Sequence, residues 1–181
     1  IDRFYLAVLD RLCARDPAAK VVMLPQLYGV GERGDVRYFE KLKAQSAHRD
    51  RIVVLPETCG SDVQQALIAK ARFMVGARYH SIVFAINNRV PFVSLSYEHK
   101  MPGLLELLGL EARGVDVRSL GQPDFDEAAG LREIEARLDA PLLPDAVAAR
   151  AHALAQDCFQ ALCRRIEACG GSAPTVRAGK A

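Results

Sequence analysis

The sequence lacks several features that mark large classes of protein. None of its apolar runs approaches the roughly 18 residues that a membrane-spanning helix needs, and we see no signal peptide at its start. Its formal net charge is only +2, which is too small to indicate nucleic-acid binding. We therefore expect neither a membrane-spanning protein nor a partner of nucleic acid.

The five cysteines do not form a recognisable framework. Their number is odd and no two are spaced as CxxC, which argues against a set of paired disulfides. The spacing of Cys158, Cys163 and Cys169 does not stack them on one face of a helix. We expect reduced thiols in the cytoplasm, with the inner membrane surface as an alternative location, and neither a metal site nor a cofactor.

What the chain does contain fits one globular domain. Its 181 residues are half hydrophobic and one quarter charged, and no internal repeat or second domain is visible. We expect a domain over residues 1–169, with its core at 20–117 and C-terminal helices at 127–168, followed by a flexible tail at 170–181. Because the chain opens at Ile1 and not at Met, we expect it to be a fragment.

Short apolar runs alternate with amphipathic segments along most of the chain. Uninterrupted apolar strands separated by helices are typical of a parallel sheet that is covered on both faces. The sequence therefore predicts an α/β fold, a Rossmann-like parallel sheet with helices on both faces. The expected strands span 21–24, 52–55, 73–77, 92–95 and 114–117, and the expected helices span 2–14, 36–46, 81–86, 102–108, 127–138 and 145–168, with a further helix that Ser61 or Asp62 is expected to cap.

Charged and proton-transferring residues follow two neighbouring strands. Arg78 and His80 come directly after the third expected strand, and Lys100 follows the fourth. Ligands bind at the carboxyl edge of an open parallel sheet, where these side chains should meet. The helix that starts near Ser81 adds free backbone N–H groups at the same edge. Together these groups suit a small anion that carries phosphate or carboxylate.

Each of these residues also has a purely structural interpretation. Arg78 could form one surface salt bridge, and His80 could satisfy a backbone group at the start of its helix. Lys100 could be a solvated charge that opens the next helix, and Asp35 is first of all a candidate helix cap. Mutation would then change stability without changing ligand binding.

A glycine-rich segment invites a different interpretation. Residues 29–34, GVGERG, match the dinucleotide pattern GxGxxG, and Glu57 ends the next expected strand. The spacing does not fit that pattern, however, because residues 25–28 separate the strand from the first glycine and Gly34 precedes the candidate cap, Asp35. The interpretations left open are a loop that grips a ligand, with Gly31 in contact, a plain flexible loop and, least favoured, a dinucleotide site.

The run from residue 76 to residue 110, GARYHSIVFAINNRVPFVSLSYEHKMPGLLELLGL, combines several motifs in a fixed order. A glycine-x-Arg-x-His motif precedes an apolar helix, a Val-Pro strand, a Tyr-x-x-Lys segment and a Leu-Gly-Leu helix end. In this order the chain resembles the polysaccharide pyruvyl transferase family. An earlier segment that carries Gln26 and Asp35 is similar too, so the resemblance covers roughly residues 20–117. The matching residues are Gly76, Arg78, His80, Val90, Pro91, Tyr97, Lys100, Leu108, Gly109 and Leu110.

The resemblance implies the C-terminal half of a GT-B fold, with an N-terminal half of the same enzyme as its partner. It also implies transfer of pyruvate from phosphoenolpyruvate to a sugar or lipid-linked saccharide as a ketal, in exopolysaccharide or cell-surface glycan biosynthesis. His80 would donate the proton to the enol carbon. The substrate-binding residues would be Arg78, Ser81, Lys100, Gln26 and Gly31.

Two other function classes stay open. A GT-B glycosyltransferase or sugar epimerase would bind a nucleotide sugar in the same crevice and needs a carboxylate for the ribose hydroxyls, for which Glu98 is the candidate. A non-catalytic Rossmann-like module would bind no small ligand, and substitution of Arg78 or His80 would then leave its thermal stability unchanged.

Overall fold

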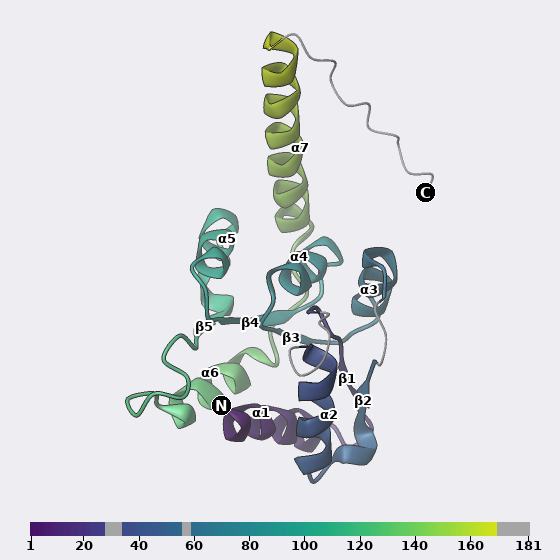
Figure 1. Ribbon diagram of the computed structural model, residues 1–181, viewed down its shortest axis with the longest axis vertical. Helices are drawn as coiled ribbons and strands as arrows, with labels where there is room; N and C mark the ends of the chain where they lie inside the picture. The colour runs from purple at the N-terminus through teal and green to yellow at the C-terminus, as the bar shows by residue number, and fades with distance from the viewer. Residues whose placement is uncertain (28–33, 56–58, 170–181) are drawn as a thin grey trace.

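The strands form two short parallel sheets in the computed structural model, which describes residues 1–27, 34–55 and 59–169. In the first sheet β1 (Val21–Met23) pairs with β2 (Ile52–Val54). In the second, β4 (Phe92–Ser96) lies between β3 (Met74–Gly76) and β5 (Gly114–Asp116). All pairings are parallel, so the predicted α/β fold is confirmed, although the described strands do not join into one sheet (Figure 1).

The helices stand where the apolar periodicity predicts them, within one or two residues at most ends. α4 begins two residues earlier than expected, so that Tyr79 and His80 belong to its first turn. The described helices are α1 (Asp2–Arg15), α2 (Asp35–Gln45), α3 (Ser61–Ile68), α4 (Tyr79–Asn87), α5 (Lys100–Leu108), α6 (Glu127–Arg137) and α7 (Asp145–Ala168), with 3-10 turns at Arg49–Arg51 and Glu111–Arg113.

Glycine, and not an acid or serine, occupies the N-cap of two helices. Gly34 precedes α2 and Gly60 precedes α3, and neither helix has a side-chain cap bond. The predicted caps are therefore wrong, because Asp35 and Ser61 are the first residues inside their helices and Asp62 is the second. Glycine is tolerated at this position, and the Asp35 carboxylate is left available for another partner.

The sequence explains both ends of α5. Pro102 lies in its first turn, where the missing N–H has no intrahelical partner to lose. Gly109 ends the helix with φ of 68°, a left-handed conformation that favours glycine. The N–H of Leu110 reaches the carbonyl of Leu105 at 2.8 Å, which completes a Schellman motif.

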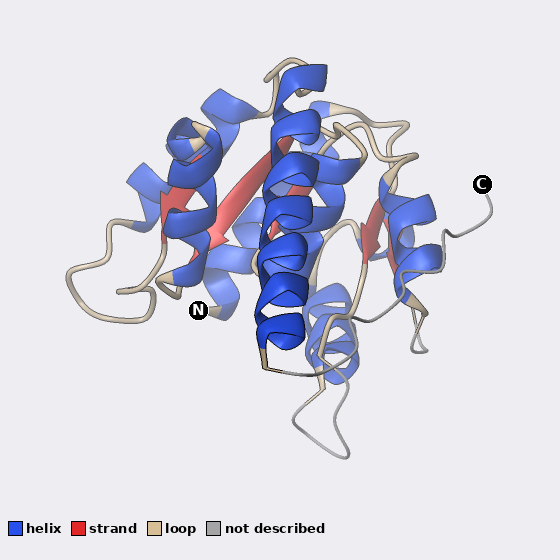
Figure 2. Ribbon diagram, turned by 90° about the horizontal axis from the view of Figure 1, so that it is seen from above, coloured by secondary structure: helices blue, strands red, loops and turns tan. Residues whose placement is uncertain are grey.

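Helices cover both faces of the three-stranded sheet, as predicted (Figure 2). The fully buried strand β4 alternates between two apolar clusters: Phe92 packs with α4 and α5, whereas Val93 and Leu95 pack with α1 and α6. Such burial contributes roughly 25 cal/mol per Å² of apolar surface, which makes β4 the centre of the core. A smaller cluster joins α1, α2 and β2 through Leu9, Leu42 and Ile52.

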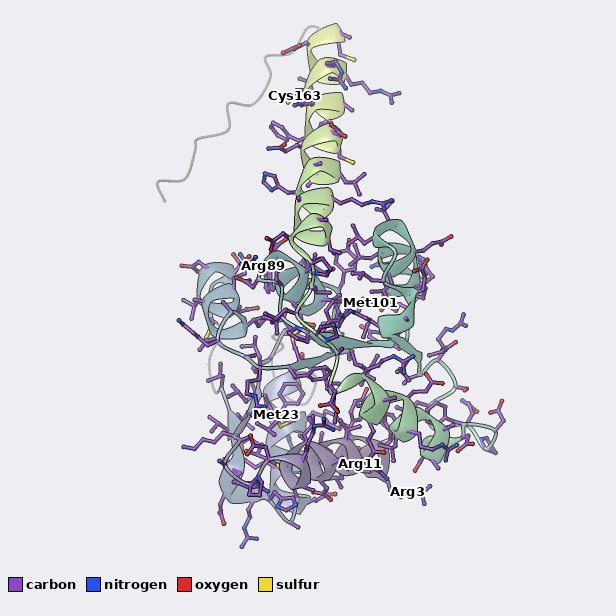
Figure 3. The ribbon with its side chains drawn as sticks, turned by 180° about the vertical axis from the view of Figure 1, so that it is seen from behind. Arg3, Arg11, Met23, Arg89, Met101 and Cys163 are labelled. Carbon is purple, nitrogen blue, oxygen red and sulfur yellow. The ribbon has the colours of Figure 1, made fainter. Side chains whose placement is uncertain are left out.

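Ion pairs tie α1 to the C-terminal part of the chain. Arg3 pairs with Glu127 and Arg11 pairs with Glu135, and Figure 3 labels both arginines on α1 beside α6. These pairs are exposed, so each contributes under about 1 kcal/mol. Packing of Phe4 and Val8 against Ile134 holds the two helices together more strongly.

Among the described residues, it is the first part of α7 that packs on the rest of the molecule. Val147, Ala151 and Leu154 contact the cluster around α4 and α5, and no residue of α7 is buried. The remainder stands out from the molecule, with Cys163 on the projecting part and Leu162 exposed (Figures 1 and 3). None of the described helices combines the length and hydropathy that crossing a membrane requires. The predicted tail at 170–181 lies outside the described residues.

Candidate functional site

A cleft of about 250 Å³ opens at the carboxyl ends of β3 and β4, where the sequence predicts the site. Three segments line it: the loop after β1 (Gln26 and Leu27), the junction of β3 with α4 (residues 77–80) and the junction of β4 with α5 (Tyr97, Glu98, Lys100 and Met101). The cleft brings together four of the predicted site residues, and its polar lining includes Gln26, Arg78, His80, Tyr97, Glu98 and Lys100. Gly31, a further predicted residue, lies outside the described residues, as does Glu57.

Arg78 is held on two sides. Its Nη2 donates to Oδ1 of Asp35 at 2.9 Å and its Nη1 donates to the hydroxyl of Tyr97 at 3.1 Å. The guanidinium carbon lies 6.0 Å from the centroid of the Tyr97 ring, within cation–π range. Burial lowers the pKa of Arg78, but the hydrogen bond and charge of Asp35 outweigh it, so the net pKa is raised. Arg78 therefore stays charged and has a fixed direction.

Asp35 connects Arg78 to the loop after β1. Its Oδ2 accepts the backbone N–H groups of Gln26 at 2.9 Å and Leu27 at 2.8 Å, while its other oxygen faces Arg78. The N–H of Asp35 in turn donates to the carbonyl of Leu27 at 3.0 Å. The carboxylate is thus turned toward the site instead of capping α2. Sequence reasoning missed this contact, although Asp35 lies in the segment that carries the family resemblance.

The side chain of Gln26 points to α3. Its Nε2 donates to Oε1 of Gln64 at 2.5 Å, and Nε2 of Gln64 donates to the carbonyl of Cys59 at 2.7 Å. Gln64 is only 6% exposed, and a buried amide requires such partners. Gln26 therefore lines the cleft while its amide group binds α3, and its predicted contact with substrate stays a prediction.

His80 is exposed in the first turn of α4 and lines the cleft. Its ring lies 6.0 Å from that of Tyr79 and 6.4 Å from that of Phe84. No hydrogen bond from the described residues to the His80 ring is seen, so the structural interpretation, that His80 satisfies a backbone group, has no support there. An exposed imidazole at a cleft is free to meet a ligand.

Ser81 lies behind the cleft lining and binds the backbone of Arg78. Its hydroxyl donates to the carbonyl of Arg78 at 2.6 Å, and the residue is 8% exposed and does not line the cleft. Its backbone N–H belongs to the first turn of α4, whose free N–H groups favour an anion. The predicted role of Ser81 in binding therefore depends on its backbone.

Gly76 allows this packing. A Cβ atom on Gly76 would lie 2.7 Å from both the Ser81 hydroxyl oxygen and Cδ1 of Ile82. Ile82 is fully buried, so it has little room to move. The glycine of the Gly-x-Arg-x-His motif is required because α4 packs directly against the end of β3.

Lys100 has its own acid. Its Nζ lies 3.7 Å from Oε2 of Glu98, and its side chain is 63% exposed. Lys100 is the first residue of α5, where the helix dipole disfavours a cation, and Glu98 offsets that effect. In the described part of the cleft, both Arg78 and Lys100 are thus paired with a carboxylate.

Comparison with a known family covers the residues that line the cleft as far as Glu98 and ends before Lys100. The family model described as polysaccharide pyruvyl transferase matches residues 2–99, which is more than half of the sequence. The amylovoran biosynthesis protein AmsJ of Erwinia amylovora is 39% identical over 54 residues, which cover 30% of this chain and 13% of AmsJ. No solved structure matches. The chain belongs to the polysaccharide pyruvyl transferase family.

Proposed function

We propose that this chain is the donor-binding half of a pyruvyl transferase, which moves pyruvate from phosphoenolpyruvate to two hydroxyls of a sugar as a ketal. The observation that carries the proposal is the cleft that Arg78, His80 and Lys100 line together. The similarity to an amylovoran biosynthesis protein supports an exopolysaccharide or cell-surface glycan as the product.

The charges of the cleft suit the donor. Phosphoenolpyruvate carries a phosphate and a carboxylate close together, so its site needs more than one fixed cation. Arg78 supplies a planar guanidinium that binds either group through two parallel bonds, and Lys100 supplies a second positive charge. The first turn of α4 adds backbone N–H groups and the positive end of a helix dipole.

We assign the proton transfer to His80, which lines the cleft. Ketal formation requires protonation of the enol carbon, attack by sugar hydroxyls on the cationic carbon, and departure of phosphate. One C–O bond to phosphate breaks and two C–O bonds to the sugar form. Of the two hydroxyl protons released, one balances the new methyl group and the other leaves with phosphate. An imidazole suits the first step because it exchanges protons near neutral pH.

We place the acceptor site in a part of the whole enzyme that lies outside this chain. The chain covers a small share of AmsJ, so we assign acceptor binding to an N-terminal half, with a GT-B-like cleft between the halves. A sugar or lipid-linked saccharide would enter from that side. Cys13, Cys158, Cys163 and Cys169 are free thiols, which fits a reducing compartment, so we place the reaction in the cytoplasm, at the inner membrane surface for a lipid-linked acceptor.

Calorimetric titration with phosphoenolpyruvate tests the donor site. Arg78→Ala should weaken binding by about 10- to 100-fold, the loss expected for charge-assisted hydrogen bonds. Arg72→Ala is the matched control, because Arg72 also pairs with an aspartate but lies away from the cleft. Binding of a UDP-sugar in place of phosphoenolpyruvate would replace this proposal with the glycosyltransferase interpretation, and binding of NAD would restore the glycine-loop interpretation.

A further inference from the structure

We propose that Asp35 is a positioning residue, which orients Arg78 for the anion and so sets the affinity of the donor site. This inference rests on the proposed function and adds a residue that acts through Arg78 instead of touching the ligand. Neither the family motif nor helix capping accounts for the place of its carboxylate.

Both carboxylate oxygens of Asp35 accept hydrogen bonds. One oxygen accepts two backbone N–H groups, from Gln26 and Leu27, and the other accepts from Arg78. Its side chain is 13% exposed, the lowest value for an acid in any ion pair of the described residues. Such a carboxylate cannot rotate without breaking several bonds, so it couples the position of Gln26 and Leu27 to that of the guanidinium.

Arg78 keeps donors for a ligand in this arrangement. A guanidinium has about five N–H groups, and the bonds to Asp35 and Tyr97 use one on each terminal nitrogen. The two partners approach from different segments, the start of α2 and the loop after β4. They therefore hold the plane of the guanidinium while leaving further N–H groups available to the cleft.

A negative charge beside an anion site weakens anion binding by repulsion, so attraction is not what Asp35 contributes. Its contribution is orientation: an arginine that is already held loses less conformational freedom when the ligand binds. Removal of Asp35 would strengthen anion binding by relieving repulsion and weaken it by loss of orientation. The loss of orientation is the larger effect.

A double-mutant cycle on the dissociation constant of phosphoenolpyruvate tests the inference. Asp35→Asn should weaken binding about tenfold, the size expected for one well-placed charge-assisted bond. In the Arg78→Ala background the same substitution should change binding by less than about twofold, because its effect passes through Arg78. Equal weakening in both backgrounds, or unchanged affinity in the single variant, would overturn the inference.

The matched control is Asp16→Asn. Asp16 also accepts from an arginine, Arg72, and from a backbone N–H, that of Ala18, but it lies away from the cleft. It should leave the dissociation constant unchanged. Asp35→Glu is the second variant, since it keeps the charge and moves the carboxylate by one methylene group. It should also weaken binding, and wild-type affinity in a folded Asp35→Glu protein would count against orientation as the mechanism.

A measurement without ligand separates this inference from the proposed function. Rotation of the Arg78 guanidinium about its Nε–Cζ bond, followed by 15N exchange NMR, should be slow in the wild type and faster in Asp35→Asn. Asp16→Asn should leave Arg78 unchanged. If the wild type fails to bind phosphoenolpyruvate, the proposed function fails, yet this readout still decides on Asp35: unchanged rotation in Asp35→Asn would refute its positioning role.

Discussion

The hydroxyl of Ser81 donates to the carbonyl oxygen of Arg78 at 2.6 Å and closes the first turn of α4. The backbone bond from Ile82 to the same carbonyl is long, at 3.4 Å, so the serine hydroxyl is its better partner. Arg78, the proposed anion-binding residue, and Ser81, in the first turn of α4, are thus fixed to each other.

Ser81→Ala should therefore lower the free energy of unfolding by about 1 kcal/mol, the usual loss for a buried hydrogen bond. Urea denaturation measures this change. Ser61→Ala, at the exposed first position of α3, is the control and should change stability by less than half as much. An equal effect of the two substitutions would show that the Ser81 bond has no special value.

Gly76→Ala should cost about 1–3 kcal/mol, because the new methyl group would meet Ser81 and Ile82 at 2.7 Å. Gly103→Ala offers the contrasting control, since a Cβ there meets nothing within 4 Å and the position is inside α5. That substitution should stabilise the protein by up to about 1 kcal/mol through helix propensity. Thermal melts of the two variants should shift in opposite directions.

His80→Gln should reduce turnover of the intact enzyme by about 10²- to 10⁴-fold, the usual contribution of a proton donor. Phosphoenolpyruvate affinity should change little, because Arg78 and Lys100 remain. His152→Gln, on exposed α7, is the control and should keep full turnover. Wild-type turnover in His80→Gln would remove His80 from the mechanism while leaving the anion site intact.

Asp2 gives the stability of this chain a dependence on pH. The Lys41 ammonium, first, and the Tyr38 hydroxyl, second, donate to its carboxylate and lower the pKa of Asp2 below its usual 3.8. Its contribution is therefore present above pH 3.8 and is lost as the pH falls through the lower folded value. Asp2→Asn should destabilise the protein near neutral pH, and in urea denaturation its difference in stability from the wild type should shrink as the pH falls below 3.8. A difference in unfolding free energy between Asp2→Asn and the wild type that grows as the pH falls would contradict this assignment.

The sequence predicts the order of elements well because the strands are continuous apolar runs. β4, with all five residues buried, and α5, with its terminal glycine, are clear cases. The separation of the strands into two sheets was not predicted, since pairing depends on how helices space the strands. The domain limits and the GT-B half remain predictions, because no solved structure matches the chain.

The site was predicted in part. Arg78, His80 and Lys100 line one cleft because parallel strands end at the same edge of a sheet. The sequence shows this, since these residues directly follow two apolar strands. The bond between Asp35 and Arg78 joins residues 43 positions apart and requires the start of α2 to lie beside the start of α4, which no local pattern encodes. Local propensity instead favoured Asp35 as the N-cap of α2, but the N-cap is Gly34.

The pairing of each strong cation with an acid governs how a ligand would arrive. With Asp35 beside Arg78 and Glu98 beside Lys100, the described cleft projects little field beyond the Debye length of about 8–10 Å. Long-range steering would then be weak, and the association rate of an anion should depend little on ionic strength. Salt would act mainly on the dissociation rate, by screening contacts that form only after the anion has entered.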